Sequence, residues 1–217
     1  MKILFISILA VMLLVAGAYF AYTKSVVKKP VTCQSLSPRP VIVAFGDSLV
    51  VGYGAPEGEG FVDDLSTSIR TPILNAGIVG NTTADGLTRI QEVLDQKPDI
   101  VLLLLGGNDA LRKIPLAQTS ANLDSILKTL SDKKITIVLL APPGGLLSDP
   151  YAPLYKALAK KYSTELVPNV LGGLIGHSEF MTDTVHPNSV GYKKLAEKVL
   201  PTLNSACNTY TTTVGGR

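Results

Sequence analysis

The chain of 217 residues is 46% hydrophobic and 17% charged, and its formal net charge is +3. This positive charge belongs to the N-terminal arm, because residues 1–40 carry five of the 20 basic side chains and none of the 17 acidic ones. The remaining 177 residues hold 15 basic side chains against 17 acidic ones, so they lack the net positive charge of a nucleic-acid-binding domain. We therefore expect one domain with a sizeable core and no nucleic-acid partner.

The chain begins with an uncharged segment of twenty residues, 3–22. A helix of this length, at ~1.5 Å per residue, spans the ~30 Å hydrocarbon layer of a bilayer, which predicts a signal anchor or transmembrane helix over 1–23. Residues 24–40 contain lysine, serine and proline without periodicity and are predicted to form a stalk. Small residues at 16–18 also fit a signal-peptidase site. We favour an uncleaved anchor in the cell membrane with the domain outside the cytoplasm, whereas cleavage would make the protein secreted.

Two cysteines flank the predicted domain. Cys33 precedes the first predicted strand, and Cys207 follows the last predicted helix. If that strand runs up the sheet and that helix returns to its starting edge, both thiols lie near the same edge. Two hypotheses stay open, a disulfide suited to an oxidising compartment or two unpaired thiols.

Five apolar segments along 41–204 alternate with segments of helical periodicity. The predicted strands are 41–45, 72–76, 99–105, 135–141 and 165–167, and the last helix begins after Asn188. Short connections between alternating strands and helices predict a doubly wound parallel sheet with helices on both faces. The threonine-rich end, 205–217, is predicted to be a flexible tail.

The first strand ends in Gly46-Asp47-Ser48, which places Ser48 on a strand-to-helix loop. Open α/β sheets carry their chemistry at this carboxyl edge. A serine there can be a helix cap or a nucleophile, and a nucleophile needs a base, a group that orients the base, and donors for the oxyanion.

The loop before the last helix offers the base and its orienter. Asp183 lies three residues before His186, so its carboxylate can accept the far ring N–H and fix the tautomer. His177, beside Glu179, is the minor alternative as base. Two histidines and two distant cysteines give no zinc spacing, so we expect no metal.

Two further loops offer oxyanion donors. Gly80 can bring its backbone N–H close to a ligand, and Asn108 can supply a side-chain amide. Together with the Ser48 N–H, these groups would form an oxyanion hole.

Four ordered blocks, Gly46-Asp47-Ser48, Gly80, Gly107-Asn108-Asp109 and Asp183-x-x-His186, resemble those of the GDSL-type SGNH hydrolases over about residues 41–204. The similarity is greatest to the bacterial branch of arylesterases, thioesterases and lysophospholipases. The resemblance implies a flavodoxin-like three-layer α/β/α fold, with Ser48 as nucleophile, His186 as base and Asp183 as orienter. It also implies an oxyanion hole of Ser48, Gly80 and Asn108, and no cofactor.

We therefore expect a membrane-tethered serine esterase that forms an acyl-enzyme on Ser48 and acts on a small acyl ester or lysolipid. An acetylesterase or O-acyltransferase for cell-envelope sugars is an alternative, as is a non-catalytic binding module. Apolar or small residues on the expected active-edge loops are candidates for binding the acyl group: Ile78, Val79, Leu111, Gly145 and Leu146.

Overall fold

The computed structural model describes residue 33, residue 36 and residues 38–144 and 149–214, with the backbone alone at 211–214. The predicted membrane segment, 1–23, and most of the predicted stalk lie outside the described residues. Within the described part of the chain, each helix is too short or too polar to cross a membrane.

The five predicted strands form one parallel sheet in the order β2-β1-β3-β4-β5. The three central strands are apolar and almost fully buried, as expected of strands covered on both faces, whereas the two edge strands are partly exposed. The strands are β1 (Ile42–Gly46), β2 (Ile73–Gly77), β3 (Ile100–Leu104), β4 (Thr136–Leu140) and β5 (Glu165–Val167). The register pairs Gly46 with both Gly77 and Leu104, so β1, β2 and β3 end level with one another. The loops that follow these three strands therefore meet at one edge.

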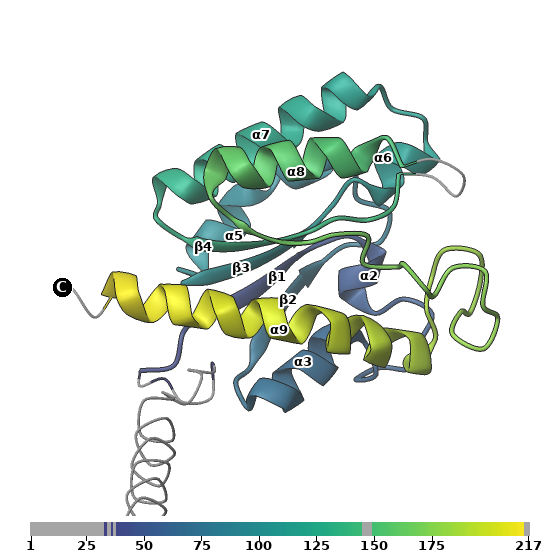
Figure 1. Ribbon diagram of the computed structural model, residues 1–217, viewed down its shortest axis with the longest axis horizontal. Helices are drawn as coiled ribbons and strands as arrows, with labels where there is room; N and C mark the ends of the chain where they lie inside the picture. The colour runs from purple at the N-terminus through teal and green to yellow at the C-terminus, as the bar shows by residue number, and fades with distance from the viewer. Residues whose placement is uncertain (1–32, 34–35, 37, 145–148, 215–217) are drawn as a thin grey trace, which may run out of the picture. The chain divides into compact units, whose positions relative to one another are not determined.

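Helices cover both faces of the sheet and complete a three-layer α/β/α fold (Figure 1). They are α2 (Ser48–Val51), α3 (Phe61–Ile69), α4 (Thr83–Thr88), α5 (Ile90–Asp95), α6 (Gly107–Leu111), α7 (Leu116–Asp132), α8 (Tyr151–Tyr162) and α9 (Ser189–Val214). Alternate residues of β1 serve the two cores: Ile42 and Ala44 pack with α3 and α9, whereas Val43 and Phe45 pack with α7 and α8. Each core contains a continuous set of fully buried aliphatic side chains, whose burial is the main driving force for folding.

Most of the segment predicted to be a flexible tail is helical, because α9 continues to Val214. The apolar spacing of Val199 and Leu203 carries on through Ala206 and Cys207, all four fully buried. This apolar face keeps the helix packed on the sheet beyond the point at which the threonine-rich composition suggested disorder.

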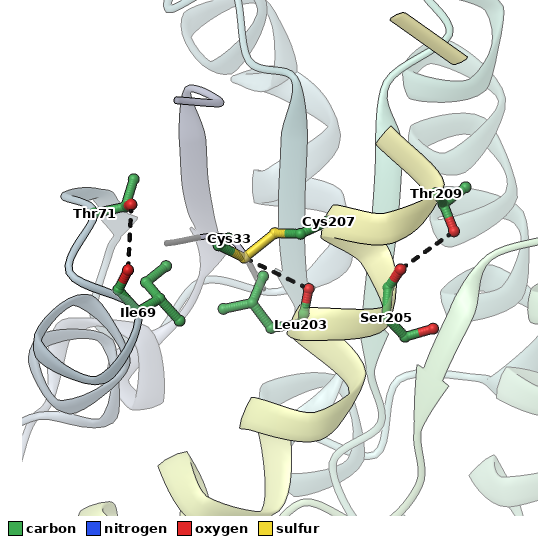
Figure 2. The surroundings of a disulfide bond; sticks show 7 residues. All are labelled: Cys33, Ile69, Thr71, Leu203, Ser205, Cys207 and Thr209. Carbon is green, nitrogen blue, oxygen red and sulfur yellow. Dashed lines mark hydrogen bonds between the residues drawn. A yellow bond between two sulfur atoms is a disulfide. The ribbon is translucent and has the colours of Figure 1, made fainter. Parts of the chain in front are cut away.

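A disulfide joins Cys33 to Cys207, with the two Cα atoms 5.2 Å apart (Figure 2). Both cysteines are fully buried and belong to the core cluster that contains α9. The first of the two hypotheses for the cysteines therefore holds in the structure. The bridge fixes the chain just before β1 to the last turns of α9.

Candidate active site

Ser48 is the first residue of α2 and follows the end of β1 after one intervening residue, Asp47. The Asp47 side chain caps α2, since its Oδ1 accepts the Leu49 N–H at 3.0 Å. Gly46 lets this turn lie against the end of β3, because a Cβ there would collide with the Leu104 carbonyl. The capped turn holds the Ser48 hydroxyl at the carboxyl edge of the sheet.

The structure brings together the three residues predicted to form a catalytic chain. Ser48 Oγ lies 3.0 Å from His186 Nε2, and His186 Nδ1 lies 2.7 Å from Asp183 Oδ2. Asp183 Oδ1 also accepts the backbone N–H groups of Val185 and His186, each at 2.8 Å. With the ring proton on Nδ1, the hydroxyl donates to Nε2 and the ring donates to the carboxylate. This arrangement can move the hydroxyl proton to the imidazole.

Asp183 is suited to remain charged. Burial acts to raise the pKa of its carboxyl, but hydrogen bonds from the His186 ring and from the Val185 and His186 N–H groups outweigh that effect and lower the pKa. A carboxylate there orients the imidazole and stabilises its protonated form.

The loop after α2 supports the histidine. The rings of Tyr53 and His186 lie 4.7 Å apart between centroids, and the Tyr192 hydroxyl donates to the Tyr53 carbonyl at 2.7 Å. Thr182 donates its hydroxyl to the Gly54 carbonyl and its N–H to the His186 carbonyl. Sequence reasoning missed Tyr53, because only the tertiary fold brings it against a histidine more than 130 residues away.

The predicted oxyanion donors lie on neighbouring loops. The Ser48 N–H has no acceptor within α2, because it begins the helix. Asn108 Nδ2 donates to the Asn81 carbonyl at 3.0 Å, which places the Asn108 amide beside the loop that contains Gly80. Gly80 has a φ of 80°, a left-handed conformation that favours glycine, and its carbonyl accepts from Arg112 at 2.8 Å. Gly80 itself is not among the residues that line the cleft described below.

Two buried carboxylates hold the loops around Ser48 and Asn108. Burial raises the pKa of Asp47 to about 6, against the opposing effects of the Leu49 N–H and the His186 charge. Asp109, fully buried beside Asn108, accepts the Thr83 N–H at 2.9 Å, the Thr83 hydroxyl and the Thr119 hydroxyl. These bonds tie α6 to α4 and α7 and so fix the position of Asn108.

An apolar cleft of about 360 Å³ opens beside Ser48, His186 and Asn108. Among the predicted acyl-binding residues, Leu111 lines the cleft, whereas Ile78 and Val79 are exposed and do not. The loop after β2 leaves these two side chains about half exposed, and their role in binding the acyl group stays a prediction. Gly145 and Leu146 lie outside the described residues. The wall also contains Pro142 and Pro143, and three further apolar residues that were not predicted: Leu171, Ile175 and Val185.

The alternative base lies elsewhere. His177 Nδ1 is 3.4 Å from Glu179 Oε1, both side chains are more than half exposed, and neither residue lines the cleft. In the part of the chain that the structure describes, no three histidine, cysteine or acidic residues cluster closely enough to bind a metal ion.

Comparison with known proteins gives one consistent family. Residues 44–194 match the model of the GDSL-like lipase/acylhydrolase family. An arylesterase of Vibrio mimicus is 32% identical over 170 residues, which cover 73% of this chain and 85% of that protein. Thioesterase 1/protease 1/lysophospholipase L1 of Escherichia coli is 31% identical over 157 residues, 68% of this chain and 75% of that protein.

A solved structure supports the same assignment. The crystal structure of AlinE4, a SGNH-hydrolase family esterase, is 39% identical, with a TM-score of 0.61 over 77% of this chain and 96% of that one. The family match covers more than half of the chain and contains all four sequence blocks. This chain therefore belongs to the GDSL-like lipase/acylhydrolase family of SGNH hydrolases and is an esterase that hydrolyses carboxylic esters.

Proposed function

We propose that the enzyme hydrolyses acyl esters through a covalent acyl-enzyme on Ser48. The observation that carries this proposal is the hydrogen-bonded chain from Ser48 through His186 to Asp183 at an apolar cleft. Ser48 Oγ attacks the ester carbonyl carbon while His186 Nε2 takes the hydroxyl proton. The tetrahedral oxyanion is held by the Ser48 N–H, the Gly80 N–H and the Asn108 amide.

The second half of the reaction uses the same groups. His186 gives its proton to the departing alcohol or thiol, which leaves the acyl group esterified to Ser48. His186 then takes a proton from water, the resulting hydroxide attacks the acyl carbon, and Ser48 leaves with that proton. Asp183 stays ionised throughout and stabilises the imidazolium formed at each step.

The cleft supports an apolar acyl group as substrate. Its walls include Leu111, Leu171, Ile175 and Val185, and burying an alkyl chain there gains about 0.8 kcal/mol per methylene. A lysolipid or a medium to long acyl ester or thioester fits these walls better than an acetylated sugar does. The name of the Escherichia coli relative, which includes thioesterase and lysophospholipase, supports this class.

We also propose that the domain works outside the cytoplasm, attached to the membrane by residues 1–23. The disulfide between Cys33 and Cys207 supports this location, because such bonds persist in oxidising compartments.

The test of the proposed function is hydrolysis of nitrophenyl esters, from acetyl to long acyl, by the full chain and by its Ser48→Ala variant. Ser178→Ala, which removes an exposed hydroxyl away from the cleft, is the matched control. We expect a rate maximum beyond acetyl, and a loss of activity in Ser48→Ala alone. Activity that survives in Ser48→Ala would contradict the acyl-enzyme, and a maximum at acetyl would contradict the lipid-like substrate.

A further inference from the structure

A buried guanidinium lies behind the loops of the site. Arg89 is 9% exposed and occupies the junction between α4 and α5, where its φ of −110° interrupts the helix. Its hydrogen bonds go to uncharged oxygen atoms: Nε to Asn81 Oδ1 at 2.6 Å, Nη1 to the Ala76 carbonyl at 2.9 Å and Nη2 to the Gly46 carbonyl at 2.7 Å. The guanidinium also lies over the Phe45 ring, 4.4 Å from its centroid.

These three acceptors belong to the segments that carry the oxyanion donors. Gly46 lies two residues before Ser48 in the sequence. Its carbonyl also accepts the Ile78 N–H at 3.1 Å. The Ala76 carbonyl lies at the end of β2, just before the loop that contains Gly80. Asn81 follows Gly80, and its own carbonyl accepts the Asn108 amide. One planar cation therefore connects the end of β1, the end of β2 and the Gly80 loop.

The cost of burying this charge suggests that it has a specific role. Glu92 and Asp85 favour the charged guanidinium, but burial outweighs them and lowers the pKa of Arg89. The buried charge is therefore still costly, and an apolar side chain of similar size would pack between sheet and helix without that cost. An apolar side chain could not hold the three acceptor oxygen atoms at fixed distances from one another. The rigid fork of arginine does so, whereas a lysine ammonium has neither the planar geometry nor the same reach.

We propose that Arg89 is a positioning residue for the oxyanion hole, an inference that rests on the proposed function. It does not line the cleft, so its role is to position other groups. It holds the Ser48 N–H and the Gly80 N–H at the separation that the tetrahedral oxyanion requires, and through Asn81 it helps to set the Asn108 amide. A displacement of about 1 Å in such groups costs on the order of a hundredfold in rate.

The experiment compares Arg89→Lys, Arg89→Ala and Asn81→Ala in the full chain. Asn81→Ala removes the acceptor of Nε but keeps the backbone carbonyl that binds Asn108. The matched control is Leu130→Ala, a fully buried residue of α7 that is remote from the cleft and whose loss destabilises the fold by creating a cavity. For each variant, kcat and KM for one nitrophenyl ester are measured together with the thermal midpoint, at a temperature where every variant is folded.

We expect Arg89→Lys to lower kcat by about tenfold to a hundredfold and to change KM by less than about threefold, because the transition state loses more than the bound ester. Asn81→Ala should show a smaller loss of the same kind. Added guanidinium ion, below denaturing concentrations, should restore part of the kcat of Arg89→Ala. Leu130→Ala should lose stability but keep kcat.

The proposal is overturned if Arg89→Lys and Asn81→Ala keep kcat within about twofold of the wild type. It is also overturned if Leu130→Ala loses as much kcat as they do for a similar fall in the thermal midpoint. If Arg89→Ala or Arg89→Lys does not fold, Asn81→Ala decides the question with the same readout. Failure of the proposed function is detected separately, because it appears as activity that survives in Ser48→Ala, independently of the kcat of the Arg89 variants.

Discussion

Replacement of Asp47 by asparagine should stabilise the protein in a pH-dependent way. The pKa of this carboxyl is about 6 in the folded protein, because burial disfavours its charged form, against an ordinary value of 3.8. The folded protein therefore binds this proton more tightly than the unfolded chain does. The sign follows from linkage: stability falls as the pH rises from about 4 to about 6, and above that range the ionised Asp47 costs about 3 kcal/mol.

An asparagine side chain at this position would carry no such cost. Its Oδ1 can still accept the Leu49 N–H, but its amide would face the Asn108 amide, which lies 3.4 Å from Asp47 Oδ2. The loss of that weak contact lowers stability by the same amount at every pH. The quantity to test is therefore the pH dependence of the gain. From the two pKa values, the gain should be larger by about 2 kcal/mol at about pH 8 than at about pH 4.5.

The assay is urea unfolding at both pH values, followed by far-UV circular dichroism because the chain contains no tryptophan. Asp95→Asn, at an exposed position on α5, is the matched control for the change of charge. A gain for Asp47→Asn that is equal at the two pH values, or larger at the acidic one, would refute the reasoning that burial governs this carboxyl.

Two other predictions test the donors and the bridge. Asn108→Ala should lower kcat by about a hundredfold to a thousandfold with little change in KM. The control Gln91→Ala, which removes an exposed amide, should leave kcat unchanged. A comparable rise in KM at constant kcat would instead show that Asn108 binds the ground state of the substrate. The double change Cys33→Ser and Cys207→Ser opens a loop of 174 residues, whose closure is worth at most about 5 kcal/mol in unfolded-chain entropy. We expect the free energy of unfolding to fall by about 2 to 5 kcal/mol in urea titrations, with reductant lowering the wild type toward the same value, and an unchanged midpoint would contradict this account.

The sheet could be predicted from the sequence because it depends on local composition. Short apolar segments bounded by glycine or polar loops predicted all five strands, and the predicted 165–167 strand coincides with β5. Parallel topology then places the ends of strands at a common edge, so residues as distant as Ser48 and His186 could be expected to meet. The contact between them, at 3.0 Å, lies where that topology puts it.

Features that depend on the direction of individual side chains could not be predicted in the same way. Ile78 and Val79 lie on a loop at the active edge but are about half exposed and do not line the cleft, and nothing in their sequence spacing distinguishes residues that face the cleft from residues that do not. The break between α4 and α5 at Arg89 could not be predicted either, because Leu87, Ile90 and Leu94 recur at the spacing of one continuous helix. The helical continuation through Ala206 and Cys207 likewise depends on a packing partner, the core beneath α9, that composition does not reveal.

The bond between Cys33 and Cys207 gives the domain the topology of a closed ring. Every strand of the sheet, and each loop that supplies Ser48, Gly80, Asn108 or His186, lies between these two cysteines in the sequence. A protease that cuts one exposed loop would therefore open the ring without separating two pieces. The nicked protein would remain a single covalent molecule, and the sheet on both sides of the cut would stay tethered at the edge opposite the active site.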